Sequence, residues 1–325
     1  MNGSGAAPGP DRPASLPARW WRYQAERFPL FGYAPLITAF TFASISYSRS
    51  ARRFAGLPDA AGFVPWPLFA VGAFTSLACF LLLRVLDEHK DAETDRRWRP
   101  ELPVPRGLVS LGELRVLGAV LVALSVAANA LVAPVLLLPL LLVAGWAALM
   151  TKEFFIRDWL RAHLGAYLVT HMLIMPMIDA YTTGIDWLVA GRHAPSGLPW
   201  FLAATFANGV LVEIGRKLRA PADEREGVDS YTHAWGARRA PLAWLAVLVA
   251  AAGVVTIAAR STGASGLSAA IVFPAAALLA IPAVRFVATG DGRAAKQVEL
   301  ASGLWGLISY LTLGFGPMLA GLLGR

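Results

Sequence analysis

Three properties of the sequence predict an all-α fold built from membrane-spanning helices. Of the 325 residues, 56% are hydrophobic and only 15% are charged, and the mean hydropathy is +0.54. A soluble domain carries about 25% charged residues. The apolar residues also fall into runs of about 17–25, the length that crosses a hydrocarbon layer as one helix. We therefore expect a polytopic membrane helical bundle around a central cavity.

Nine such runs are separated by short polar segments, and no segment remains that could form a soluble domain. The third and fourth runs meet at Ala133–Pro134, which predicts a tight hairpin. We expect one transmembrane domain over 29–325, preceded over 1–28 by a tail and an interfacial segment. Residues 2–18, rich in Gly, Ala, Pro and Ser, are expected to be disordered. The runs are 29–47, 64–86, 114–132, 134–151, 163–181, 199–218, 240–259, 266–287 and 297–320.

The distribution of basic residues predicts the orientation in the membrane. With a cytoplasmic N-terminus, 23 of the 29 Lys and Arg fall in inner segments, as the positive-inside rule requires, and the C-terminus lies outside. The net charge of +8 is thus a topology signal, and no nucleic-acid partner is expected. Arg49, Arg52 and Arg53 go against this orientation. The single cysteine, Cys79, excludes an intramolecular disulfide and a Cys-based zinc site.

The first acidic cluster follows the 64–86 run directly. Asp87, Asp91 and Asp95 are spaced i, i+4, i+8, which places them on one stripe of a helix. Like charges at this spacing destabilise a helix, and a divalent cation would offset the repulsion. Oxygen ligands without a suitably spaced Cys or His favour Mg²⁺. The alternative is a solvated, charged helix end just beyond a membrane span.

A second acidic cluster follows the sixth run, on the same predicted side of the membrane. Glu213 lies at the end of an apolar helix, where an unpaired carboxylate is costly. It either serves a functional site or forms a structural ion pair with Arg216 and Lys217, at i+3 and i+4. Pro221 is expected to break the helix, so that Asp223 begins a loop.

Two acidic clusters flanked by Lys and Arg are typical of a site for a diphosphate held by Mg²⁺. Loss of diphosphate from an allylic substrate requires charge stabilisation of the leaving group and a dry, apolar cavity around the cation. The sequence has no Walker A, GxGxxG, HExxH or GxSxG motif for another chemistry.

In these motifs the chain resembles the UbiA superfamily of intramembrane prenyltransferases. The family's first motif, Asn/Asp-x-x-x-Asp-x-x-x-Asp, is met by Asp87, Asp91 and Asp95, and Arg99-Pro100 and Pro105-Arg106-Gly107 resemble its continuation. The second motif departs further, in the manner of a divergent member. Gly227-Val228-Asp229-Ser230 resembles its tail and Asp223 its last aspartate, but Arg219 stands where another aspartate is expected.

The resemblance implies a nine-helix enzyme that transfers a prenyl group from a prenyl diphosphate to an aromatic or other lipophilic acceptor, with Mg²⁺ as cofactor and membrane lipids around it. It implies that Asp87, Asp91 and Asp95 bind Mg²⁺, with Glu213 and Asp223 on the opposite side. The implied diphosphate ligands are Lys152, which resembles the family's lysine in that loop, and the weaker candidates Arg106, Arg157 and Lys217, each of which has an alternative role as a topology or headgroup residue.

The 163–181 run carries polar residues that could contact the second substrate. Tyr167 and His171 are i,i+4 neighbours on one face. A histidine within the membrane acts either as a base that removes a proton after bond formation or as a structural hydrogen-bond donor. Asp179 lies near the outer end of the same run, far from the acidic motifs.

Two alternatives remain open. A UbiA-type terpene cyclase would ionise the same diphosphate and close the cation on itself, so that product forms from prenyl diphosphate alone. A cation-coupled transporter would bind ions at the acidic clusters. Transporters place their coupling acids near the bilayer midplane, whereas nearly all acids here lie at one edge.

Overall fold

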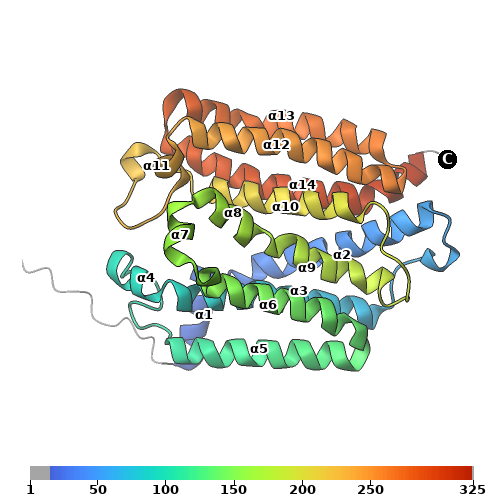
Figure 1. Cartoon of the computed structure of the whole chain (residues 1–325), viewed down its shortest axis with the longest axis horizontal. Helices are drawn as coiled ribbons and strands as arrows, with labels where there is room; N and C mark the ends of the chain where they lie inside the picture. Colours follow the sequence, from blue (N-terminus) through green and yellow to red (C-terminus); the bar gives the residue numbers. More distant parts are fainter. Residues whose placement is uncertain (1–14, 324–325) are drawn as a thin grey trace, which may run out of the picture.

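The computed structural model describes residues 15–323, and this range contains helices and no strand. Nine helical segments in it are long and apolar enough to span a membrane. Their axes lie roughly parallel to one another, along the horizontal direction of Figure 1. The predicted fold class and number of spans are confirmed. The spans are α2 (Leu30–Phe54), α3 (Trp66–Lys90), α5 (Leu111–Val132), α6 (Leu137–Thr151), α8 (Leu164–Met172) continued by α9 (Ile174–Trp187), α10 (Leu198–Arg216), α12 (Arg239–Ala258), α13 (Ser265–Thr289) and α14 (Gly292–Leu323).

Four short helices gather at one end of the bundle, at the left in Figure 1. We call this the charged end. The short helices are α1 (Leu16–Arg27), α4 (Ala92–Trp98), α7 (Arg157–Ala162) and α11 (Tyr231–Trp235).

Several helix boundaries differ from the predicted ones for local reasons. α3 continues to Lys90, beyond the apolar run. α5 begins at Leu111 because Ser110 and Glu113 form a capping box. The tight hairpin at Ala133–Pro134 is confirmed. Residues 1–14 lie outside the described range, but disorder up to residue 18 is wrong, since α1 begins at Leu16.

The end of α10 is also different from the expected one. The helix stops at Arg216, before Pro221 is reached. The loop backbone is instead bonded to the returning chain: Tyr231 N donates to Lys217 O at 3.1 Å, and Arg219 N donates to Thr232 Oγ1 at 3.0 Å. Proline is therefore not what ends this helix.

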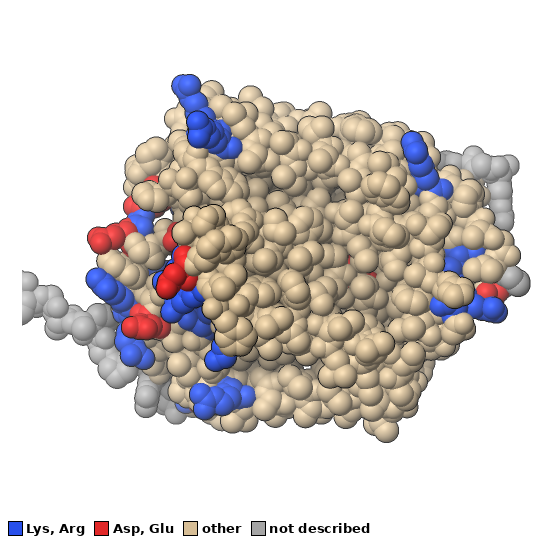
Figure 2. All heavy atoms as spheres, in the orientation of Figure 1, with Lys and Arg blue, Asp and Glu red and all other residues tan. Residues whose placement is uncertain are grey.

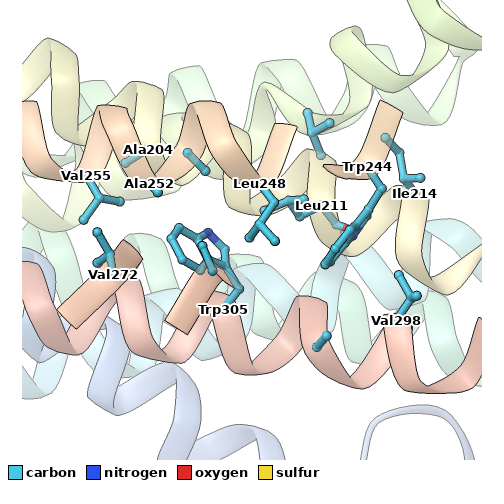
Figure 3. Close-up of a cluster of buried hydrophobic side chains, with 14 of the residues drawn as sticks. Ala204, Leu211, Ile214, Trp244, Leu248, Ala252, Val255, Val272, Val298 and Trp305 are labelled. Atoms are coloured by element: carbon cyan, nitrogen blue, oxygen red, sulfur yellow. The ribbon is translucent and has the colours of Figure 1, made fainter. Parts of the chain in front are cut away.

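The largest buried cluster joins α10, α12, α13 and α14 (Figure 3). Trp244 and Trp305 are fully buried in it. The indole N–H of Trp244 donates to Leu211 O at 3.1 Å and to Ser302 Oγ at 2.9 Å. A Cβ on Gly215 would lie 2.2 Å from Ser302 Oγ, so glycine allows the close approach of α10 and α14. Small residues at such contacts are typical of helix packing in membranes.

The opposite end contains the arginine cluster that contradicts the positive-inside rule. Arg49 and Arg52 both donate to the buried carboxylate of Asp186 at 2.8 Å, and Arg52 also pairs with Asp59. Arg53 donates to the backbone oxygens of Ala60 and Gly62. Much of the cluster's charge is thus neutralised by acidic partners, which explains why it can stand at this end.

The short helix α1 packs against the charged end, where Trp20 and Tyr23 join a small apolar cluster. The Arg27–Glu88 contact is the most buried of its ion pairs, since the Glu88 side chain is 1% exposed. This pair places α1 beside the last turn of α3. Ion pairs between α1 and other described residues include Arg19–Glu113, Arg27–Glu88 and Glu26–Arg106.

Candidate functional site

Charged side chains gather at the charged end, with a smaller group at the opposite end and a band with few charged side chains between them (Figure 2). The first acidic motif lies here, where α3 passes into α4. Asp91 separates the two helices. The i to i+4 backbone bonds nevertheless continue, since Asp91 N donates to Asp87 O at 2.9 Å and Asp95 N donates to Asp91 O at 2.8 Å. The helical spacing predicted for the motif is kept across the break.

The three aspartates have different surroundings. The side chain of Asp87 is 47% exposed and lies 3.9 Å from Lys90 Nζ. That of Asp91 is half-buried and, among the described residues, has no hydrogen bond or ion pair. Asp95 is buried and pairs with Arg99 at 2.6 Å. Burial raises the pKa of Asp95 above its usual range, although Arg99 opposes the shift. Asp87 and Asp91 are therefore the more available oxygen ligands.

The α10 side of the site is an ion-paired cluster. The Glu213 side chain is 2% exposed, and Arg216 and Lys217 contact its carboxylate at 2.5 and 2.8 Å. The ion pair predicted from the spacing is confirmed. Asp87 is close enough to interact electrostatically with Arg216, so the α3 and α10 sides face each other.

The ring of Tyr167 on α8 joins the two sides. Lys90 Nζ donates to the Tyr167 hydroxyl at 3.0 Å and lies 5.4 Å from the ring centroid, and Lys217 Nζ lies 5.1 Å from the same centroid. Lys217 Nζ also lies 5.9 Å from the centroid of the Tyr231 ring, and the buried hydroxyl of Tyr231 has no hydrogen-bond partner among the described residues. Burial, followed by Glu213, raises the pKa of Tyr231, so this hydroxyl stays protonated and can donate.

His171 lies one helical turn after Tyr167 on α8 and is buried. It stacks on Tyr167 with centroids 3.7 Å apart. Its Nδ1 lies 3.0 Å from the Tyr167 carbonyl, which can only accept, so Nδ1 carries the proton. The buried Nε2 has no partner in the part of the chain that the structure describes. It is an acceptor available to a bound molecule.

A strained turn places an aromatic ring against His171. Glu153, Phe154 and Phe155 have φ of 46°, 53° and 61°, a left-handed conformation that non-glycine residues rarely adopt. The Phe154 ring lies 6.1 Å from His171, edge to face. Such strain persists only where the surroundings hold it, and it concentrates at functional sites.

The loop after α10 closes over α4. Gly227 has φ +72°, and a Cβ there would lie 2.4 Å from the Trp98 indole. Glu224 fastens the loop by accepting hydrogen bonds from the hydroxyls of Ser230 and Thr232. The segments that carry the two motifs are therefore in direct contact.

The model of the UbiA prenyltransferase family matches residues 54–311. The chain belongs to this family.

Two solved structures share the fold. One is of a digeranylgeranylglyceryl phosphate synthase, with a TM-score of 0.60 and 14% identity over 93% of this chain and 99% of that one. The other is the apo structure of a UbiA homolog from Aeropyrum pernix K1, with a TM-score of 0.63 and 17% identity over 88% of this chain and 97% of that one. No curated protein sequence matches the chain significantly. The family resemblance expected from the motifs is thus confirmed, and the protein is an integral membrane protein of a prenyltransferase family.

Two residues that the UbiA resemblance implies as ligands are exposed and, among the described residues, are not bonded to the cluster around Tyr167. Asp223 is exposed and faces the start of α14, where its Oδ2 would be 2.4 Å from a Cβ on Gly292. It lines a separate surface pocket with Arg293 and Lys296. Lys152 is exposed at the end of α6 and, within the described range, makes no side-chain bond.

Two arginines named by the resemblance have other partners. Arg106 pairs with Glu26 of α1 at 2.7 Å. Arg157 pairs with Glu153 of the strained turn at 3.2 Å. The structure thus brings together Asp87, Glu213, Lys217, Tyr167 and His171, and adds Lys90, which the sequence analysis did not single out. Its i+3 spacing from Asp87 was the available signal.

The fit to Mg²⁺ differs between the two sides. Asp87 and Asp91 present carboxylate oxygens, the donors that Mg²⁺ prefers. Both oxygens of Glu213 are occupied by cations. Within residues 15–323, no three His, Cys, Asp or Glu side chains are gathered as a metal site. The α3 side fits the metal and the α10 side does not.

Proposed function

We propose that this UbiA-family protein is a Mg²⁺-dependent prenyltransferase that ionises a prenyl diphosphate at the charged end and transfers the prenyl group to an aromatic or other lipophilic acceptor. The observation that carries the proposal is the meeting of Asp87 with Lys90 and Lys217 around Tyr167. Acids that can hold a metal and cations that can hold phosphate oxygens lie at the end of an apolar bundle.

The residues of this site act on the leaving group. Lys90 and Lys217 donate to diphosphate oxygens and hold the C1–O bond at the end of the bundle. Asp87 and Asp91 would hold Mg²⁺, which supplies positive charge to the departing diphosphate when bound. The bond breaks with its electron pair on the diphosphate, and the acceptor supplies the pair that forms the new bond to C1. Fixed charges in a site that excludes water are effective for such a step.

An apolar groove of about 740 Å³ supports a lipophilic substrate. It begins at Leu30, just after α1, and extends along α2 to Phe42. There, Phe42 stacks on Phe315 and Phe63 at 5.1 and 4.6 Å. The helical rise between Leu30 and Phe42 is about 18 Å, so a prenyl chain could lie along this apolar surface for much of its length.

The acceptor would meet Tyr167 and His171 below the diphosphate. The free Nε2 of His171 can accept a hydrogen bond or a proton from the acceptor as the new bond forms. The excess of Lys and Arg predicted for this side supports a cytoplasmic charged end, so the diphosphate would enter from the cytoplasm.

The test is mass spectrometry of products formed by the purified protein with Mg²⁺ and geranyl, farnesyl or geranylgeranyl diphosphate, with and without aromatic acceptors. We expect a prenylated acceptor, lost in Asp91→Ala and retained in the matched control Asp158→Ala, whose carboxylate is exposed on α7. A cyclic hydrocarbon or terpene alcohol formed without acceptor would identify a terpene cyclase instead. If no diphosphate is consumed, the proposal is wrong, and ion transport is to be measured next.

A further inference from the structure

We infer that the α10 side of the site holds the diphosphate directly, through Lys217, Arg216 and the hydroxyl of Tyr231, and that no second metal ion is bound there. The inference rests on the proposed function, because it specifies how the same site holds its substrate.

The acids of the second motif are not placed to bind a metal. Glu213 is buried with Arg216 on one carboxylate oxygen and Lys217 on the other. A metal ion there would have to displace both cations. Asp223 lies in a different pocket, beside Gly292, and Glu224 is bonded to hydroxyls of its own loop. The acids of the second motif therefore do not converge on one point.

The same side instead presents cations and a donor to the interior. Lys217 Nζ lies 5.1 Å from the Tyr167 centroid and 5.9 Å from the Tyr231 centroid, between two aromatic faces. An aromatic face attracts a cation more weakly than a phosphate does, so Lys217 can turn to an entering anion. Across from it, Lys90 is held by the Tyr167 hydroxyl.

The hydroxyl of Tyr231 is an independent indication of a ligand. Tyr231 is fully buried and its hydroxyl has no partner among the described residues. A buried hydroxyl without a partner is costly, so a water, an ion or a bound ligand is expected to satisfy it. Tyr231 interacts electrostatically with Glu213 and Tyr167, which places it at the same cluster. A diphosphate oxygen would satisfy this donor.

The charges of the cluster are consistent with this assignment. Asp87, Asp91 and Glu213 oppose Lys90, Arg216 and Lys217, and Arg84 lies 4.0 Å from Asp87, so these residues alone carry an excess of one positive charge. A diphosphate adds negative charge, which one metal site at Asp87 and Asp91 can compensate on the α3 side. On the α10 side, the anion and Glu213 share the same two cations.

The experiment is calorimetric titration of inorganic pyrophosphate into the full-length protein in detergent, once with EDTA and once with Mg²⁺. We expect binding in EDTA, tightened by Mg²⁺. Lys217→Met and Tyr231→Phe should each weaken the binding in EDTA by about tenfold, the effect of one lost charge-assisted hydrogen bond. Lys296→Met, an exposed lysine of α14, is the matched control and should leave the affinity unchanged.

The variant Glu213→Gln distinguishes direct diphosphate binding from the alternative that Glu213 binds a second metal ion, and it does so even if Lys217→Met fails to fold. Removal of the competing carboxylate frees both cations, so pyrophosphate should bind more tightly in either buffer. If Glu213 were a metal ligand, the same variant would weaken binding in Mg²⁺. Weaker binding of Glu213→Gln in Mg²⁺ would overturn the inference. So would a loss of Mg²⁺-dependent binding in Asp223→Asn, or no binding of pyrophosphate to the unaltered protein in EDTA.

The outcome can be told apart from failure of the proposed function. Inorganic pyrophosphate carries no prenyl chain, so its binding does not depend on prenyl transfer. If the protein consumes geranylgeranyl diphosphate but binds pyrophosphate only with Mg²⁺, the proposed function holds and the inference about the α10 side is wrong. If it binds pyrophosphate in EDTA but never ionises a prenyl diphosphate, only the proposed function is wrong.

Discussion

The ion pair between Arg27 and Glu88 is expected to hold α1 against the charged end. Glu88 is 1% exposed and Arg27 16% exposed, so the pair is largely removed from water. Removing one partner of a buried pair leaves an uncompensated charge and costs about 3–5 kcal/mol. Because Arg27 retains some exposure, we expect Arg27→Met to destabilise the protein by about 3 kcal/mol, the low end of that range.

A double-mutant cycle with Glu88→Gln isolates the charge interaction. In the Glu88→Gln background no buried charge is left behind, so Arg27→Met should cost only about 1 kcal/mol, the value of an ordinary hydrogen bond. The coupling energy between the two positions is then about 2 kcal/mol. The measurement is unfolding in mixed micelles by sodium dodecyl sulfate, followed by circular dichroism, together with tryptic cleavage within α1 at Arg19 and Arg22, sites that remain in every variant of the cycle.

The control concerns another ion pair of the same helix. Arg106→Met breaks the more exposed Glu26–Arg106 pair, which should contribute less than about 1 kcal/mol. If Arg27→Met costs the same whether position 88 is unaltered or carries Glu88→Gln, the ion pair does not hold α1, and the apolar contacts of Trp20 and Tyr23 must do so instead.

Three further predictions concern the segments that connect the spans at the charged end. Gly227→Ala should destabilise by about 1–2 kcal/mol, because alanine is strained at φ +72° and would meet Trp98; tryptic cleavage of the loop should become faster. Phe155→Gly should stabilise by about 0.5 kcal/mol, since this exposed residue has φ 61°, and unfolding midpoints would show the gain. Burial raises the pKa of Asp95 in the folded state, so its contribution to stability is lost as the pH rises above 3.8. The stability of the unaltered protein relative to Asp95→Asn, measured in EDTA, should therefore fall between acidic and neutral pH; an unchanged difference would contradict this.

Local sequence signals account for the fold and for part of the site. Spanning helices follow from composition, since any apolar run of sufficient length must satisfy its backbone hydrogen bonds internally in lipid. The pairing of Glu213 with Arg216 and Lys217 follows from helical spacing alone. The ends of helices were less predictable, because they depend on caps and on contacts with returning loops, such as the one that ends α10.

The membership of the site was decided by tertiary packing. Lys90, Tyr167 and Lys217 come from three different parts of the chain, and no spacing along it reports that their side chains share one ring. Asp223 is only ten residues from Glu213, yet the turn between them sends it to the start of α14.

Hydropathy and charge act residue by residue, so the sequence was sufficient to predict the nine helices of residues 15–323 that are long and apolar enough to cross a membrane, and the charged groups at one end. Tertiary packing was needed to show which of those charges are available to a ligand and which neutralise one another. An ion pair depends on the distance between side chains that the chain brings together from remote positions.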